Sequence, residues 1–332
     1  MKRLSLIHQN YNMLDVMKFV MAIVVVAIHT RPEWSFNSSL VKEIFESIYS
    51  IAVPFFFMAS GFLLFRKISL PLDKEGEKRI KTYIKRIVKL YLIWTLIYLP
   101  LSIYGFYLDG MPILKSIAVF FRNILLIGEN YMSWPLWYLL ALIVAVGIIY
   151  ILLKIRVPEN WIVVISVIMA IIGLGLDYCK ENSILQPVTD MYFSVFQKTR
   201  NGFFVGFLYV ALGLLCSRFE SMPLMWIIIT FILGLVGVFC KIPLLNILLV
   251  FSLFVITISL EISFVRFQQF SYLRVLSSIF FLIHMYFVTY LIHFTDINNG
   301  LLMFFMVVLF STTLGICLMR CKTSRLFKVL FY

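Results

Sequence analysis

Residues 12–30 read NMLDVMKFVMAIVVVAIHT, an apolar run that contains three ionisable residues, Asp15, Lys18 and His29. As a helix, a run of this length can cross the roughly 30 Å hydrocarbon core of a bilayer. Ionisable side chains are costly in that setting, and they commonly mark a path for ions, protons or substrate. Lys18 and His29 are separated by about three turns and roughly 16 Å of helix. We therefore expect both on one stripe of the first span, at different depths.

The rest of the chain is equally apolar. Its 332 residues are 62% hydrophobic and 14% charged, whereas soluble domains average about 45–50% apolar and about 25% charged residues. This composition predicts an all-α polytopic membrane protein, because a single soluble core could not bury so much apolar surface. We expect about ten transmembrane helices, near residues 12–31, 48–66, 83–105, 134–153, 159–177, 200–217, 222–238, 243–261, 273–293 and 300–319.

The connections predict the topology. Most of the 29 Lys and Arg residues fall in connections on the side of the N-terminus, so the positive-inside rule predicts cytoplasmic N- and C-termini. The net charge of +13 then needs no nucleic-acid partner. Residues 112–127 are amphipathic and are interpreted as an interfacial or re-entrant helix. We expect residues 1–332 to form a single transmembrane domain without a metal site, and pairing of Cys179 with Cys240 stays open.

Two histidines and a lysine are candidates for chemistry within the spans. His29 and Lys18 could act as a base with an anion-binding group, or as two steps of a proton path. They could equally be an interfacial histidine and a lysine that extends to the inner headgroups. Asp15, three positions before Lys18, suits a local ion pair with it. His284 lies in the middle of the ninth span, where it must face the bundle interior or water.

A second group of candidates lies at the outer ends of the spans. Arg200 and Asn201 open the sixth span in the sequence TRNGFF, where a guanidinium and unpaired backbone N–H groups suit a carboxylate or phosphate. Trp137 and Tyr138 open the fourth span; they are either interfacial belt residues or the wall of a small-molecule site. Glu33, which follows the first span, is a candidate for the ammonium end of a substrate.

Five motifs, in order along the chain, resemble the acyltransferase-3 family of membrane proteins. They are LDVMKFVMAIVVVAIH (14–29), VPFFFMASGFLLF (53–65), YIKRIVKLYLIW (83–94), SWPLWYLLAL (133–142) and LSSIFFLIHMYF (276–287). Two positions depart from the family pattern. Lys18 stands where the family usually has Arg, and Pro135 stands where many members have a polar residue or His. Lys lacks the bidentate fork of Arg, so Lys18 is less suited to hold a phosphorylated acyl donor. Both departures favour transport over acyl transfer.

Within this family, the segments IAVPFFFMASGFLLF, LWYL and TRNGFF are similar to the membrane domain of VanT-type serine racemases of glycopeptide-resistant Gram-positive bacteria. The resemblance implies a multi-pass domain of the bacterial plasma membrane that supplies L-serine to a cytoplasmic racemase. That racemase would use pyridoxal phosphate, and it would be either a domain after Tyr332 or a separate partner. No cofactor is expected in residues 1–332.

Three functions stay open at this point. In the favoured one, Arg200 and Asn201 hold the carboxylate of a small amino acid, and Glu33 or the aromatic pair Trp137 and Tyr138 takes its ammonium group. His29, Lys18 and His284 then line the path or carry a proton. In the alternative, the protein is a membrane O-acyltransferase with acyl-CoA as co-substrate. His29 is then the general base, and Lys18 contacts the acyl donor. The third is a scaffold that positions a soluble enzyme at the membrane.

Overall fold

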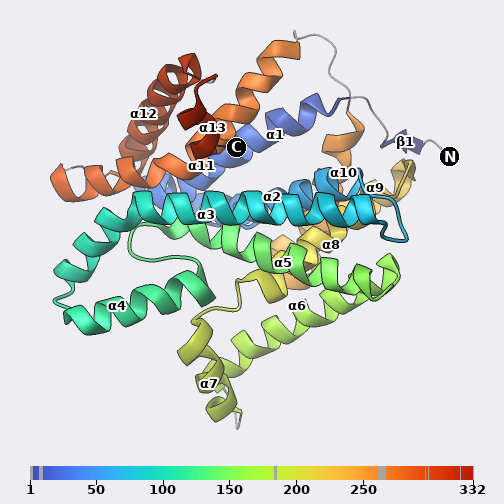
Figure 1. Ribbon diagram of the computed structural model, residues 1–332, viewed down its shortest axis with the longest axis horizontal. Helices are drawn as coiled ribbons and strands as arrows, with labels where there is room; N and C mark the ends of the chain where they lie inside the picture. The colour runs from blue at the N-terminus through green and yellow to red at the C-terminus, as the bar shows by residue number, and fades with distance from the viewer. Residues whose placement is uncertain are drawn as a thin grey trace. The chain divides into compact units, whose positions relative to one another are not determined.

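A computed structural model describes residues 3–6, 10–182, 185–260, 267–295, 297, 299–321 and 323–331. Most of these residues are helical (Figure 1). The α-helices are α1 (Asn12–Thr30), α2 (Ser39–Phe65), α3 (Lys74–Leu108), α4 (Ile113–Arg122), α5 (Trp137–Lys154), α6 (Glu159–Asn182), α7 (Gln186–Phe196), α8 (Phe207–Cys216), α9 (Leu224–Phe239), α10 (Pro243–Ser259), α11 (Phe267–Phe294), α12 (Gly300–Arg320) and α13 (Arg325–Phe331).

Short elements complete the architecture. They are the 3₁₀-helices η1 (Pro32–Ser35) and η3 (Trp134–Leu136), the π-helices η2 (Asn123–Ile127) and η4 (Gly202–Gly206), and the strands β1 (Arg3–Ser5) and β2 (Ser221–Pro223). The two strands pair antiparallel. Both π-helices directly adjoin an α-helix: η2 continues α4, and η4 leads into α8.

The helices confirm the all-α polytopic membrane fold. Within the described residues, seven are long and apolar enough to cross a membrane: Asn12–Thr30, Ser39–Phe65, Lys74–Leu108, Trp134–Lys154, Glu159–Lys180, Tyr272–Phe294 and Gly300–Arg320. Three shorter apolar helices lie at Gly202–Cys216, Leu224–Phe239 and Pro243–Ser259. Together they account for the ten apolar segments that the sequence predicts.

The chain forms two compact units. Unit 1 comprises Met1–Ala59 and Arg218–Phe331, and unit 2 comprises Ser60–Ser217. Helix α2 therefore begins in unit 1 and ends in unit 2. A single domain over residues 1–332 stays a prediction, and each unit is described by itself below.

Unit 1 is built around α1, which packs against α11, α12 and α10. Figure 1 shows α1 lying alongside α11. Leu14, Met21, Val25 and other buried residues recur on one face of α1 at helical spacing, which is the pattern of a helix packed on one side. Gly300 starts α12 against the end of α1, where an added Cβ would lie 2.3 Å from the carbonyl oxygen of Arg31. Any larger residue at position 300 would push the two helices apart.

Unit 2 is built around α5, which packs against α3, α8 and η4. Its sequence WYLLALIVAVGIIYILLK is apolar on all sides, as expected of a helix surrounded by other helices or by lipid. Gly202 brings η4 close to α5, because an added Cβ at this position would lie 2.6 Å from both the Ala141 carbonyl oxygen and the Val144 Cβ. This close approach fixes the position of the residues just before η4.

Helix α4 occupies the segment interpreted from the sequence as interfacial or re-entrant. None of its residues is buried, and Ile113 and Leu114 are 80% and 81% exposed. Apolar side chains exposed on a charged, short helix are typical of helices that lie in a membrane interface. Its location at a membrane surface stays a prediction.

Candidate functional site

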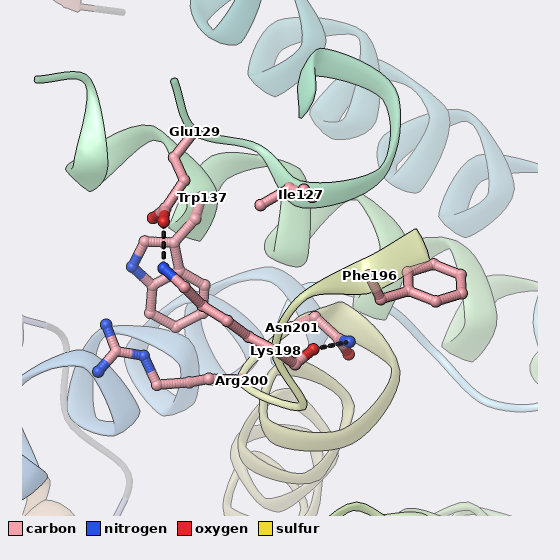
Figure 2. Close-up of a pocket in the computed structure, with 7 residues that line it drawn as sticks. All are labelled: Ile127, Glu129, Trp137, Phe196, Lys198, Arg200 and Asn201. Atoms are coloured by element: carbon pink, nitrogen blue, oxygen red, sulfur yellow. Dashed lines mark hydrogen bonds and ion pairs between the residues drawn. The ribbon is translucent and has the colours of Figure 1, made fainter. Parts of the chain in front are cut away.

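The first candidate site is a small pocket in unit 2 (Figure 2). It is formed where the connection between η2 and α5 meets the connection between α7 and η4. Its lining residues are Ile127, Glu129, Trp137, Phe196, Lys198, Arg200 and Asn201. Three of them, Trp137, Arg200 and Asn201, are candidates that the sequence singles out.

Arg200 is the cation of this pocket that is available to a ligand. Its guanidinium carbon lies 4.7 Å from the centre of the Trp137 ring system, and Figure 2 shows its side chain extending past the indole. The side chain is exposed to solvent. In the part of the chain that the structure describes, its N–H groups make no hydrogen bond. Stacking on the buried Trp137 occupies one face of the guanidinium and leaves its planar fork of donors for an anion.

Glu129 and Lys198 form an ion pair beside Arg200 (Figure 2). The Glu129 side chain is 13% exposed, whereas that of Lys198 is 50% exposed. The carboxylate is thus held in place by the protein, and the lysine reaches it from a flexible, solvent-exposed stem. A primary ammonium group is therefore bound at Glu129, within the same pocket as an unpaired guanidinium.

The side chain of Asn201 is used mainly in hydrogen bonds within the protein that shape the pocket. Its Oδ1 accepts hydrogen bonds from the backbone N–H groups of Phe203 (2.9 Å) and Phe204 (3.4 Å). It thereby caps η4 and takes up N–H groups that an anion could otherwise use. Its Nδ2 donates to the Tyr192 hydroxyl over 2.7 Å. The Tyr192 hydroxyl in turn donates to the Lys198 carbonyl oxygen over 3.0 Å, and burial raises the pKa of Tyr192 to about 12.

Thr199 adds a further tie to the same connection. Its hydroxyl donates to the Asp177 carboxylate at the end of α6. Thr199 is buried although the residues on both sides of it are exposed. The connection that carries Lys198 and Arg200 is therefore held at both ends, so the backbone of the pocket is well defined.

An apolar pocket adjoins the first one. The two share Ile127, Trp137, Phe196 and Asn201, and the apolar pocket continues along Leu140 and other residues of α5. Tyr138 lines neither pocket. It is buried, and its hydroxyl lies 2.9 Å from the Ser60 hydroxyl. Of the two aromatic residues predicted to line a small-molecule site, Trp137 lines these pockets and Tyr138 does not.

The second candidate site lies in unit 1, between α1 and α11. The rings of His29 and His284 have centroids 5.2 Å apart and are tilted by 36°. His284 is completely buried and His29 is half-buried. The structure thus brings together two residues that are far apart in sequence and that were both selected as candidates. The backbone carbonyl of Lys18 accepts a hydrogen bond from the Ser277 hydroxyl over 3.2 Å, which joins the same two helices.

Asp15 has a different partner from the one expected. Among the described residues, it pairs with Arg274 of α11 and not with Lys18. Arg274 donates three hydrogen bonds of 2.6–3.1 Å to both carboxylate oxygens. The prediction of a local pair was wrong because Asp15 points into the contact with α11, where a bidentate guanidinium binds it better than an ammonium does.

Glu33 is buried in η1 and is already engaged. It accepts a hydrogen bond from the Tyr49 hydroxyl, and Arg31 lies 3.5 Å from it. Glu33 belongs to unit 1, whereas Arg200 belongs to unit 2. The acidic residue that shares a pocket with Arg200 is Glu129, which the sequence reasoning missed. The signal was the dipeptide Glu129-Asn130 directly before the aromatic SWPLWY segment, but nothing in the sequence placed it near residue 200.

These groups suit acid–base chemistry and the binding of a small charged molecule. No group of three or more His, Cys, Asp or Glu residues that could hold a metal ion is present in the described ranges. Cys216, Cys240, Cys317 and Cys321 are free thiols.

Comparison with known proteins adds a family. Residues 11–321 match the acyltransferase-3 family model, whose description is Acyltransferase domain. An amino-acid racemase from Enterococcus faecalis is 32% identical over 210 residues, covering 62% of this chain and 28% of that protein. A serine/alanine racemase from Enterococcus gallinarum is 29% identical over 235 residues, covering 68% of this chain and 32% of that protein. The chain thus spans about a third of the length of these curated relatives. No solved structure matches it.

Proposed function

The chain belongs to the acyltransferase-3 family, as its motifs predicted, and we propose that it is a membrane domain that supplies L-serine for racemisation. The two racemases of Enterococcus are similar to it over most of its length, which supports a role shared with racemases. In this proposal the protein lies in a bacterial plasma membrane with both termini in the cytoplasm. It passes serine to a pyridoxal-phosphate racemase, as a further domain or as a partner, for D-serine production in vancomycin resistance.

The observation that carries the proposal is the combination of charges in the unit 2 pocket. A small amino acid is a zwitterion, so its site needs a cation for the carboxylate and an anion for the ammonium group. Arg200 offers an unpaired fork of donors, and Glu129 already binds the ammonium group of Lys198. The substrate ammonium would replace that of Lys198, which is free to swing away because its side chain is half exposed.

Uptake of labelled L-serine into proteoliposomes tests this proposal. Arg200→Ala removes the charge-assisted hydrogen bonds to the carboxylate, each worth about 1.5–3 kcal/mol, so half-saturation is expected at a concentration at least about tenfold higher. Glu129→Gln is expected to weaken uptake in the same way. Lys115→Ala is the matched control, because it removes an exposed cation on α4, outside the pocket. Uptake that does not saturate, or that Arg200→Ala leaves unchanged, would contradict the proposal.

A second function, O-acyl transfer, is favoured by the family to which the chain belongs. In this alternative, acyl-CoA enters from the cytoplasm, and Lys18 contacts its phosphates or polarised carbonyl. His29 takes the proton from an acceptor hydroxyl, which attacks the acyl carbonyl, and the coenzyme A thiolate leaves. Transfer or hydrolysis of acyl-CoA by the purified protein, lost in His29→Ala and retained in Arg200→Ala, would favour this function over serine supply.

A further inference from the structure

The contact between α1 and α11 brings two imidazole rings together. The centroids of His29 and His284 are 5.2 Å apart, so no substrate molecule fits between the rings. Phe280, one turn before His284 on α11, packs edge-to-face on Phe19 of α1, with ring centroids 5.4 Å apart. Two titratable rings in contact between packed helices require a chemical explanation.

The hydrogen bonding of His284 assigns its tautomer. Its Nδ1 lies 2.7 Å from the Phe280 carbonyl oxygen. A carbonyl oxygen only accepts, so Nδ1 carries the proton and donates. In the neutral ring Nε2 is therefore a lone pair. This Nε2 is buried and has no hydrogen-bond partner among the described residues. A buried acceptor without a donor is unfavourable. A proton that arrives turns Nε2 into a donor, and the adjacent His29 ring is the candidate for its acceptor.

The described residues of the neighbouring elements offer few other charged groups to this interface. On α1 and α11 they are Asp15 and Arg274, which pair with each other, together with Lys18 and His293; beyond the end of α1 they are Arg31 and the buried Glu33, which Tyr49 and Arg31 engage. The helices α12 and α10 contribute no charged residue from Gly300 to Met319 and from Pro243 to Ser259. His29 occupies the last turn of α1, where the helix dipole stabilises a positive charge.

We propose that His29 and His284 form a single proton-binding site and that this proton is the coupling ion of amino-acid uptake. The coupling rests on the proposed function; the proton site does not. A proton from the outer side binds His29, and it is then passed to the lone pair of His284 Nε2 in the adjacent ring. His29 becomes neutral again, and the pair keeps one positive charge. A second proton is excluded, because two positive rings in contact repel strongly in an apolar interior. Loss of the proton to the inner side restores the starting state.

Nitrogen-15 NMR of labelled histidine tests the proton site in the purified full-length protein in nanodiscs. The chain has only four histidines, so single substitutions assign their signals. Between about pH 8 and pH 5, the range in which histidine titrates, His29 and His284 together are expected to take up one proton. His284→Gln is expected to shift the titration midpoint of His29, whereas His293→Gln, the control on the same helix, leaves the pair unchanged. Two independent one-proton titrations would overturn the shared site.

Uptake under an imposed pH gradient tests the coupling. With the outside acidic, L-serine uptake into proteoliposomes is expected to rise several-fold, and a protonophore is expected to remove the increase. His284→Gln is expected to lose the increase, and His293→Gln to keep it. Saturable uptake that ignores the gradient would overturn the coupling while leaving the proposed function intact. Absence of uptake under every condition would overturn both the proposed function and the coupling, and the NMR titration would still decide the proton site.

Discussion

The α1–α11 contact of unit 1 and the Arg200 pocket of unit 2 place ionisable groups in opposite settings. In unit 1 the charges lie between two long helices, and Asp15 and Arg274 satisfy each other through three hydrogen bonds. In unit 2 the charges lie on connections between helices, around a pocket, and Arg200 stacks on Trp137 and forms no ion pair with any described residue. The charges in the helix interface therefore stabilise the fold, whereas the pocket built from connections leaves the Arg200 guanidinium available to a ligand.

The largest effect is expected from breaking the fixed pair of unit 1. Arg274→Ala leaves the Asp15 carboxylate, whose side chain is 7% exposed, without its partner, and loss of one member of a buried pair costs about 3–5 kcal/mol. We expect the free energy of unfolding, measured by denaturant unfolding in detergent, to fall by about 3 kcal/mol. This is the lower end of the range because Arg274 itself is partly exposed. The exchange Asp15→Arg with Arg274→Asp is expected to recover part of it. Unchanged stability would mean that the pair is not structural.

A smaller effect is expected from filling the close contact between η4 and α5. Gly202→Val places side-chain atoms against Ala141 and Val144, and such overpacking costs about 1–3 kcal/mol. Because η4 follows directly after Arg200 and Asn201, serine uptake is also expected to fall. Gly147→Ala in α5 is the control, since an added Cβ there meets nothing within 4 Å; in a helix this change is expected to be neutral or stabilising by up to about 1 kcal/mol. Equal effects of the two substitutions would contradict the close packing.

The smallest effect is a pH dependence of stability that comes from Tyr192, the hydrogen-bond partner of Asn201 in unit 2. Burial raises the pKa of Tyr192 to about 12, above the value of about 10 for an unfolded chain. Folding therefore favours the protonated hydroxyl, and this contribution is complete below about pH 10 and is lost as the pH rises toward about 12. Tyr192→Phe is expected to reduce the fall in stability over that range, measured by thermal unfolding against pH. The same fall in both proteins would show that Tyr192 does not contribute to it.

Much of the fold follows from local pattern. The first span was predicted near residues 12–31, and α1 runs from Asn12 to Thr30, because a long apolar run has no alternative to a helix in lipid. Candidates on such runs, His29 and His284 above all, were found because an ionisable residue stands out against an apolar background. The helix α7 (Gln186–Phe196) was not anticipated, since it lies in a segment that the sequence predicts to be a polar connection outside the membrane, where no lipid imposes a pattern.

Pairings between distant residues could not be predicted in the same way. The sequence suggested Lys18 for Asp15, three positions away, and the partner is Arg274. It suggested Glu33 as the acidic partner of Arg200, and the acid in that pocket is Glu129. In both cases the sequence contains several residues with the charge that the partner needs. The charge alone does not predict which of these residues lies close enough to pair.

The sequence by itself determined the membrane class, the family and most of the helices, because these depend on composition, on apolar length and on short motifs. Only the tertiary structure decided that His29 lies against His284, that Asp15 is neutralised by Arg274, and that Arg200 shares a pocket with Glu129 and Lys198. The physical reason is that a span is a property of consecutive residues, whereas a site is a property of distances. Those distances are set by how α1 packs on α11 and how η4 packs on α5.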